Sequence, residues 1–228
     1  MRTKVLLCAA ALAASLASSM AQGNVYSLNV VGYVNVTLPG SQFTCLANPL
    51  DATAGGTLPG MNDITNLFQN VPGNSFINTW NSGVNDYSTT IPIFSSRLNA
   101  WTLNLPMPPG VGVMFYNAGA DQAVTFVGQV VQGTYNVGTL GGSQFSMVGS
   151  PVPIGGDITN STTYVGLVPG ASDSVATWNG AVNDWNSPVV WSGRTSAWVG
   201  SMNIAPGQGF FYYNANAANA WVSNFTVQ

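Results

Sequence analysis

The sequence contains one pattern of residues twice, and this duplication constrains the fold more than any other feature. Gly40-Ser41-Gln42-Phe43 returns as Gly142-Ser143-Gln144-Phe145, an offset of 102 residues (142 minus 40). Further matches follow in the same order: Val71-Pro72-Gly73 with Val168-Pro169-Gly170, Thr79-Trp80-Asn81 with Thr177-Trp178-Asn179, Val84-Asn85-Asp86 with Val182-Asn183-Asp184, Arg97 with Arg194, Ala100-Trp101 with Ala197-Trp198, Pro109-Gly110 with Pro206-Gly207, and Phe115-Tyr116-Asn117-Ala118 with Tyr212-Tyr213-Asn214-Ala215. A repeat of this length indicates a duplicated domain, not the short unit of a solenoid.

Each copy has the pattern of β-structure. Short runs rich in Val, Tyr, Phe and Trp alternate with Gly, Pro, Asn and Ser, which is typical of an all-β sandwich or barrel. We expect an all-β fold of two homologous β-sandwich- or barrel-like repeats, each with at most one short helix. The expected parts are a signal peptide over 1–21, a first repeat with its N-terminal strand over 22–126, and a second repeat with its C-terminal strand over 127–228.

One segment of the first copy predicts a helix. In residues 61–71, the apolar residues recur at i, i+3, i+4 and i+7, with Asn62 or Asp63 available as N-cap. Pro72-Gly73 ends the pattern. The second copy has Asp157 and Ile158 in the same place but a Thr-rich interior, so we expect its helix to be shorter or absent.

Similar strand-forming segments flank the two copies. Residues 25–32 resemble residues 124–131, and residues 221–227 follow the second copy in the same way. This arrangement predicts a strand shared between the domains, with the first and last strands capping free sheet edges that would otherwise recruit other chains.

The N-terminus predicts export. Arg2 and Lys4 precede an apolar run over 5–17, and Ser19-Met20-Ala21 matches a cleavage site, so we expect the mature chain to start at Gln22. The run is shorter than the about 20 residues of a membrane-spanning helix, and we predict no transmembrane segment elsewhere. The expected localisation is extracellular, periplasmic or cell-surface.

The charges that remain after cleavage are few. Arg97 and Arg194 are the only cations, and seven Asp are the only acidic side chains, which gives a net charge of −5. Binding to nucleic acid is disfavoured, because it requires clustered Lys and Arg. The 46% hydrophobic content argues against disorder.

Cys45 is the single cysteine of the predicted mature chain, so no intramolecular disulfide is expected. Its counterpart in the second copy is Met147. An apolar residue at both positions predicts a buried core cysteine rather than a reactive thiol.

The Trp-Asn-x-x-Val-Asn-Asp-aromatic element has two interpretations. Aromatic faces beside Asn and Asp suit sugar rings, whereas the same residues also form a β-hairpin with aromatic pairs across its strands. The hairpin interpretation is favoured, and the sugar-binding one stays open. The candidate ligand-binding residues are Trp80, Asn85, Asp86, Trp178, Asn183, Asp184 and Trp185.

Other matched residues are interpreted as structural. Trp101 and Trp198 are expected in the core, and Pro-Gly-x-Gly at 109 and 206 is expected to form a turn that enters a buried strand. For Arg97 and Arg194 an internal ion pair, with Asp86 and Asp184 as partners, is favoured over an anion clamp. Among the aromatics without a Trp counterpart, Trp185, Trp191 and Trp221 are candidates for binding if they are exposed.

Catalytic machinery is largely excluded by composition. Without His or Lys in the mature chain, the Ser-His-Asp, Cys-His and Schiff-base arrangements and His-ligated metals cannot form. We therefore predict no catalytic, cofactor-binding or metal-binding residues, and no cofactor. An Asp-dependent hydrolase remains as a distant alternative, which requires two Asp carboxyls in one cleft.

The opening Val25-Tyr26-Ser27-Leu28-Asn29-Val30-Val31-Gly32-Tyr33-Val34-Asn35 and the segment Pro206-Gly207-Gln208-Gly209-Phe210-Phe211 resemble a group of uncharacterised exported bacterial proteins. Pro109-Gly110-Val111-Gly112 matches the second pattern more loosely. The resemblance covers nearly all of the mature chain, and it implies export and a two-repeat β architecture but no activity.

These observations favour a secreted, non-enzymatic structural or binding protein of the cell surface or extracellular matrix. Its expected partners are polysaccharide or further copies of itself. The alternatives are a tandem carbohydrate-binding module and the Asp-dependent hydrolase.

Overall fold

The computed structural model describes residues 30–53, 61–160 and 164–227. Val31–Gln228 forms one compact unit, and of the preceding unit only Val30 is described. The predicted signal peptide, its cleavage site at Ala21, the mature start at Gln22 and the beginning of the first predicted strand lie outside the described residues.

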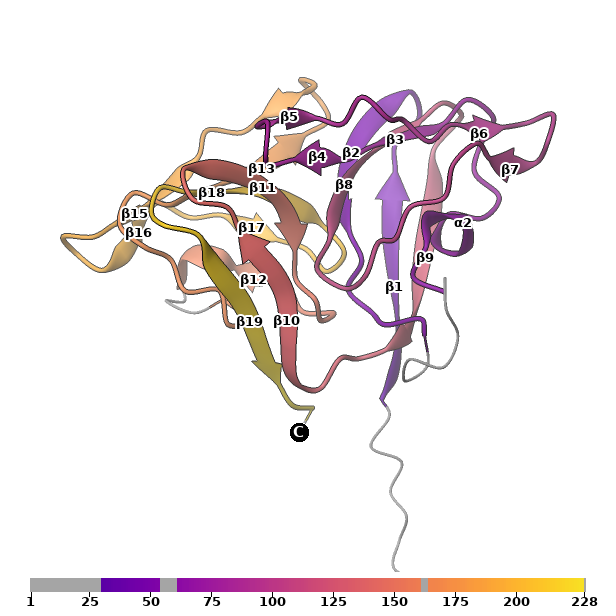
Figure 1. The fold of residues 1–228 in the computed structure, drawn as a ribbon. Helices are drawn as coiled ribbons and strands as arrows, with labels where there is room; N and C mark the ends of the chain where they lie inside the picture. The colour runs from indigo at the N-terminus through magenta and orange to yellow at the C-terminus, as the bar shows by residue number, and fades with distance from the viewer. Residues whose placement is uncertain (1–29, 54–60, 161–163, 228) are drawn as a thin grey trace, which may run out of the picture. The chain divides into compact units, whose positions relative to one another are not determined.

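The described chain is almost entirely β-structure, which confirms the predicted all-β class (Figure 1). The strands of the first repeat are β1 (Val31–Leu38), β2 (Gln42–Ala47), β3 (Phe76–Asn78), β4 (Trp80–Asn81), β5 (Asp86–Tyr87), β6 (Phe94–Ser95), β7 (Ala100–Trp101), β8 (Gly112–Asn117) and β9 (Gln122–Gln129).

The second repeat follows a similar order, with β13 in place of β3 and β4 and with the additional short strands β12 and β17. Its strands are β10 (Gly133–Leu140), β11 (Gln144–Gly149), β12 (Gly156–Asp157), β13 (Ser174–Asn179), β14 (Asp184–Trp185), β15 (Val189–Ser192), β16 (Ala197–Val199), β17 (Asn203–Ile204), β18 (Gly209–Asn214) and β19 (Asn219–Phe225).

Each repeat is built on an antiparallel sheet with the same register. β8 lies between β2 and β3 in the first repeat, and β18 lies between β11 and β13 in the second. Cys45 pairs with Met114, and their counterparts Met147 and Phe211 pair in the same way. The second sheet continues through β15 and β16, whereas the corresponding β6 and β7 form a separate pair.

The outer strands differ from the predicted shared strand. β1 pairs along its whole length with β9, and β10 pairs with β19, so each repeat joins its own first and last strands into a separate ribbon (Figure 1). The expected boundary between residues 126 and 127 falls within β9. The short segment between β9 and β10, residues 130–132, separates two strands where a single continuous one was expected.

The helix of the first repeat, α2 (Ile64–Leu67), is shorter than the predicted 61–71. Phe68 leaves helical geometry at φ −116° and ψ 64°, and Asn70 takes a positive φ of 59°. The apolar face is buried as predicted, because Ile64, Leu67, Phe68 and Val71 all enter the core. The second repeat has a single 3-10 turn, η1 (Ile158–Asn160), in this place.

A matched Asn ties each central strand to the end of the outer ribbon. The Asn117 side-chain amide donates to the carbonyls of Leu38 (2.9 Å) and Ala120 (2.8 Å). Asn214 donates to the carbonyls of Leu140 and Ala217 in the second repeat. Both side chains are buried with these partners, which explains the Asn-Ala shared by the two copies.

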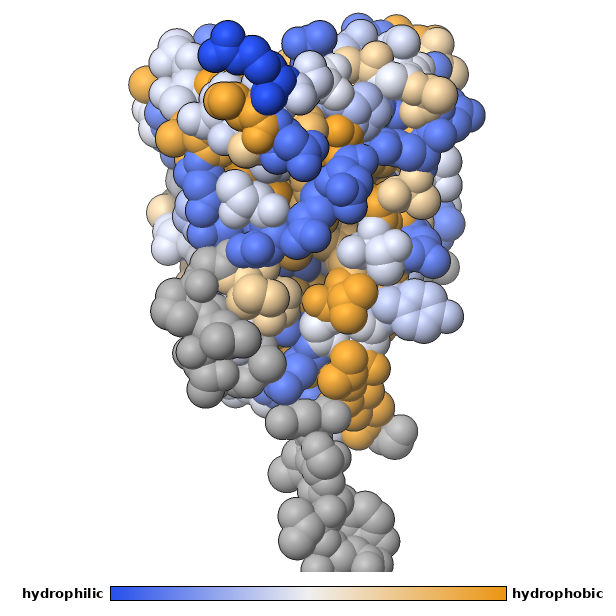
Figure 2. Space-filling model, turned by 90° about the vertical axis from the view of Figure 1, so that its right-hand side faces the viewer, coloured by the Kyte–Doolittle hydropathy of each residue, from blue (hydrophilic) through white to orange (hydrophobic). Residues whose placement is uncertain are grey.

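The surface carries hydrophobic residues between polar ones, as Figure 2 shows for one face. On the β1–β9 ribbon, Tyr33 is 73% exposed and lies opposite Val127, which is 55% exposed. The opposite face of this ribbon packs into the core. Its buried side chains are Val34, Leu38, Val124 and Phe126.

Candidate functional site

The predicted Trp-Asn hairpins are present in both repeats. Trp80 pairs with Tyr87 across β4 and β5, and Trp178 pairs with Trp185 across β13 and β14. The rings of each pair meet edge to face, at 5.1 Å and 5.3 Å between centroids. This confirms the hairpin interpretation of the repeated element.

Each hairpin reaches across to the other repeat. The indole N–H of Trp80 donates to the carbonyl of Phe145 at 2.8 Å, and the indole N–H of Trp178 donates to the carbonyl of Phe43 at 3.0 Å. Phe43 and Phe145 are themselves equivalent positions, so the two contacts are reciprocal, as in the interface of a two-fold symmetric dimer.

These contacts cover the open edges of the two main sheets. Phe145 lies on β11, the edge strand next to β18, and its backbone N–H donates to the Asn85 side-chain oxygen at 3.1 Å. Together, Trp80 and Asn85 therefore bond both outward-facing backbone groups of Phe145. An unpaired strand edge recruits other chains, so this arrangement protects it.

The Pro-Gly-x-Gly segments form the predicted turns and also join the repeats. The backbone N–H of Val111 donates to Pro108, with Gly110 at φ 87°, and Gln208 donates to Ala205 in the equivalent turn. The carbonyls of these turns accept bonds from the opposite repeat: Ala47 N–H donates to the carbonyl of Gly207 (2.9 Å), and Gly149 N–H donates to that of Gly110 (3.0 Å).

Side chains of both sheets fill the space between the repeats. Cys45, Met114, Met147 and Phe211 form a buried cluster, with aromatic rings packed around it. Cys45 is 2% exposed, and burial raises the pKa of its thiol well above the ordinary range. The predicted core position of this cysteine is confirmed.

An open aromatic pocket lies where the Trp80 hairpin meets the second repeat. The pocket has a volume of about 380 Å³. Its lining residues are Trp80, Phe145, Ser174, Ala176, Trp185, Asn186, Ser187, Pro188 and Phe211. Phe211 forms the floor, with its ring 4.2 Å from that of Trp185 and 4.6 Å from that of Trp80. None of these lining residues carries a charge. We call this the larger pocket.

A smaller pocket of about 140 Å³ occupies the equivalent place around Trp178. Its lining residues are Phe43, Asn78, Tyr87, Met114, Trp178 and Asn183. Strand register makes Asn78 the counterpart of Ala176, and Met114 the counterpart of Phe211. The buried side-chain oxygen of Asn78 has no hydrogen-bond partner in the described structure. The two equivalent places thus differ in size and in chemistry.

The candidate residues from the sequence divide between these two pockets and the hairpin turns. Trp80 and Trp185 line the larger pocket, and Trp178 and Asn183 line the smaller one. Asn85 bonds Phe145. The exposed Asp86 and Asp184 each accept the backbone N–H of the next residue at 2.7 Å and line neither pocket. The structure therefore brings some candidate residues together within one hairpin, as Trp178 with Trp185, and others across the repeats, as Trp80 with Trp185 in the larger pocket.

The remaining tryptophans are buried. Trp101 and Trp198 are 9% and 8% exposed, as expected for core aromatics. Trp191 and Trp221 are 8% and 1% exposed, so neither of these copy-specific rings is available to a ligand. Trp191 pairs with Trp198 as Phe94 pairs with Trp101.

The favoured ion pairs of the arginines are absent from the described structure. Arg97 and Arg194 are exposed, and Asp86 and Asp184 bond to neighbouring backbone N–H groups instead. Because the hairpins point across the repeat interface, the carboxylates of Asp86 and Asp184 lie away from the arginines with which they were expected to pair.

The aspartates act as local hydrogen-bond acceptors. Asp157 accepts bonds from Thr159, Ser201 and Met202, and these bonds, above all that of the Thr159 hydroxyl, hold the pKa of its carboxyl well below the ordinary range. Burial raises the pKa of Asp51, but bonds from Thr53 and Asn62 outweigh it, and the net shift is downward.

Asp173 is the one buried aspartate among the described residues. It is 1% exposed and accepts bonds from the Gly170 and Ala215 backbone N–H groups and from the Tyr212 hydroxyl. Burial and this carboxylate raise the pKa of Tyr212 far above the ordinary range. In the first repeat Ser75 takes the place of Asp173 and Phe115 that of Tyr212.

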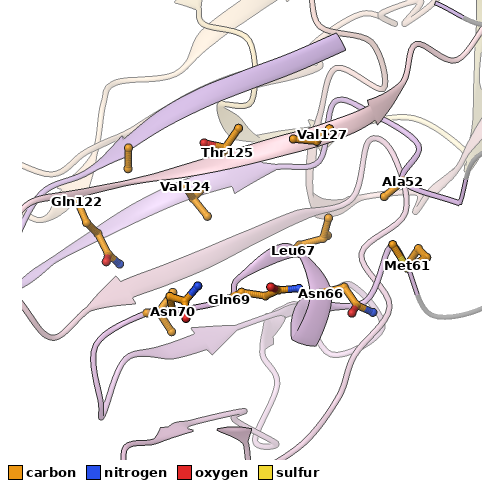
Figure 3. A pocket seen from close by; sticks show the side chains of 12 residues that line it. Ala52, Met61, Asn66, Leu67, Gln69, Asn70, Gln122, Val124, Thr125 and Val127 are labelled. Atoms are coloured by element: carbon orange, nitrogen blue, oxygen red, sulfur yellow. The ribbon is translucent and has the colours of Figure 1, made fainter. Parts of the chain in front are cut away.

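A separate groove of about 470 Å³ lies between α2 and β9 (Figure 3). Asn66, Gln69 and Asn70 border it on one side, and Gln122 and Thr125 border it on the other. Its twelve described lining residues include no aromatic and no charged side chain. The groove therefore lacks the ring-binding surface of the larger pocket.

Sequence reasoning missed Phe43, Phe145, Met114 and Phe211 as site residues. The repeated Gly-Ser-Gln-Phe contains the first two, and its recurrence was the available signal. Nothing in the spacing indicated that the Trp of one copy would contact the Phe of the other, since 65 and 135 residues separate the partners.

No family model matches this chain, and no curated protein or solved structure matches it. Within residues 30–53, 61–160 and 164–227, no helix has the length and apolarity needed to cross a membrane. The class that the fold defines is an all-β protein, in which two hairpins make reciprocal contacts.

Proposed function

We propose that this chain is an exported, non-enzymatic structural or binding protein of the cell surface or extracellular matrix. The observation that carries the proposal is the uncharged aromatic pocket at the repeat interface, which offers a binding surface without catalytic groups. The polar but weakly charged composition suits contact with neutral polymers or with further copies, because charge repulsion between molecules is small.

The hydrogen bonding of the aspartates supports a non-catalytic role. Each of the seven carboxylates accepts a hydrogen bond from nearby backbone or side-chain groups. The pKa shifts of Asp51 and Asp157 are downward, whereas a carboxyl that acts as a general acid needs an upward shift. This favours a binding protein over an Asp-dependent hydrolase.

Immunogold electron microscopy of producing cells tests the proposal. We expect label on the cell surface or in the surrounding matrix, and cell fractionation should recover the protein in the same place. Label confined to the cytoplasm would contradict export. Release of reducing sugar or peptide fragments from envelope material by the purified protein, lost in an Asp→Asn variant, would contradict the non-enzymatic role.

Carbohydrate binding is the second candidate function, and the larger pocket favours it. Trp80 and Trp185 supply aromatic surface, while the exposed Ser187 supplies a hydroxyl group at the rim. A glycan array incubated with the purified protein tests this candidate. Specific binding that free oligosaccharide competes away would support it, and an array without signal would count against it.

A further inference from the structure

We infer that the larger pocket is a single binding site for one uncharged sugar unit, and that the equivalent place in the other half of the interface does not bind it. The inference rests on the proposed binding function and names its ligand class. It differs from a tandem module, which would bind one ligand per repeat.

The size of the two pockets is the first argument. The larger pocket, at about 380 Å³, falls within the range of about 300–1,000 Å³ that small-molecule sites occupy. The smaller pocket, at about 140 Å³, falls well below it. The larger pocket therefore offers a ring more space than its equivalent does.

The substitutions between the repeats explain this difference. Ala176 has Asn78 as its counterpart, so a methyl group in the larger pocket replaces a longer amide in the smaller one. Phe211 replaces Met114 and adds a ring that packs against Trp80 and Trp185, while Trp185 replaces Tyr87 and widens the aromatic wall. Each change gives the larger pocket more aromatic surface or more space.

The lining chemistry points to an uncharged sugar. A pyranose has an apolar C–H face, which packs on aromatic rings, and a rim of hydroxyl groups, which need hydrogen-bond partners. The half-buried rings of Trp80 and Trp185 offer the first, and the buried ring of Phe211 packs against both. The exposed Ser187 hydroxyl offers the second, whereas the exposed Asn186 amide already bonds to Thr177 and Asn179. No lining residue carries a charge that would select an anion or a cation.

The indole N–H of Trp80 is already bonded to Phe145, which fixes the ring in place before any ligand binds. A fixed aromatic surface loses little conformational entropy on binding. Trp80 is thus a positioning element for the interface as well as one wall of the pocket.

Isothermal titration of the purified full chain tests the inference, with cellotetraose, N-acetylchitotetraose and mannotetraose as probes. We expect at least one probe to bind with one site per chain. Ala176→Asn installs the counterpart side chain and should weaken binding about tenfold or more, because it fills the floor of the pocket. Ser187→Ala removes a rim hydroxyl and should weaken binding about threefold to tenfold, the effect of one hydrogen bond.

Asn78→Ala is the matched control in the smaller pocket, and it should leave the affinity unchanged. Circular dichroism and thermal unfolding verify that each variant is folded. If Ala176→Asn does not fold, Ser187→Ala and Asn78→Ala alone make the comparison, since Ser187 is exposed and bears no packing role.

Four outcomes would overturn the inference: two sites per chain, equal weakening by Asn78→Ala, no saturable binding of any probe, or tighter binding of uncharged N-phenyl-1-naphthylamine that Ser187→Ala leaves unchanged. The last outcome would identify an apolar ligand site. These results are independent of cell localisation. A protein found in the cytoplasm that still binds sugar would refute the proposed function alone.

Discussion

Ala47 and Gly149 occupy equivalent positions at the ends of β2 and β11, and they face each other across the repeat interface. A Cβ atom placed on Gly149 would lie 2.2 Å from the Cβ of Ala47 and 3.0 Å from the carbonyl oxygen of Gln208. At this point of the interface one copy carries a methyl group and the other a hydrogen, and there is no room for a second methyl group.

We predict that Gly149→Ala destabilises the protein by about 1–3 kcal/mol, because the added methyl group overpacks the interface. Urea denaturation measures the change. The reciprocal exchange Ala47→Gly with Gly149→Ala should recover most of the loss, since it moves the methyl group to the other strand. A Gly149→Ala variant as stable as the wild type would show that the repeats can separate at this point without cost.

The reciprocal tryptophan bonds lead to a second prediction. Trp80→Phe and Trp178→Phe each remove an indole donor, and each should lower the free energy of unfolding by about 1 kcal/mol or more. Because both bonds join the repeats, the double variant should also broaden the single thermal transition or split it into two. Trp101→Phe, which removes a bond to Phe68 within one repeat, is the control and should keep one transition.

The raised pKa of Tyr212 predicts that the protein loses stability at alkaline pH. Its pKa is raised in the folded state by burial and by Asp173, so above about pH 10 the unfolded chain releases this proton while the folded chain keeps it. The stabilisation that Tyr212 provides below about pH 10 is therefore lost as the pH rises further. Tyr212→Phe, which installs the residue of the first repeat, should reduce the decline in the urea midpoint between pH 8 and 11. An unchanged slope would contradict the assignment.

The lowered pKa of Asp157 predicts that the protein loses stability in acid. Hydrogen bonds lower the pKa of its carboxyl in the folded state, so its contribution is present above the unfolded pKa near 3.8 and is lost as the pH falls. In Asp157→Asn we expect a flatter decline of the melting temperature between pH 5 and 2. Ser201→Ala, which removes one of several donors, should keep most of the wild-type decline; an equal effect of both would point to a different cause.

The Cys45 thiol should not react in the folded protein. It is 2% exposed, and its raised pKa keeps it protonated at neutral pH, whereas thiol reagents attack the thiolate. We expect mass spectrometry to show Cys45 unmodified by iodoacetamide in the native chain and carbamidomethylated in denaturant. Rapid labelling of the native chain would mean that the interface between the repeats opens readily.

Local patterns predicted the local structures well. The turn chemistry around Gly110 corresponds to the observed turn, and the match of Cys45 with Met147 as equivalent positions indicated the burial that the structure shows. The predicted helix is longer than the observed one, because the apolar spacing of Phe68 and Val71 reflects burial in the core and not continued helical geometry.

Contacts between the copies could not be predicted in the same way. A repeated element says that two segments share a conformation, but it does not say whether each meets its own copy or the other one. The larger pocket depends on Trp80 of one repeat meeting Phe211 of the other, and on Ala176 where the matched position holds Asn78. The sequence shows this substitution, but only the three-dimensional arrangement shows that it changes the size of a pocket.

The exchange of hairpins between the halves has a consequence for the origin of the chain. A surface that binds its own equivalent through paired, reciprocal contacts is what a homodimer possesses, so duplication and fusion of a dimeric ancestor accounts for the arrangement. Once both halves lie on one chain, each can change without altering the other. Divergence after fusion then gives an originally symmetric molecule one opening that its other half lacks.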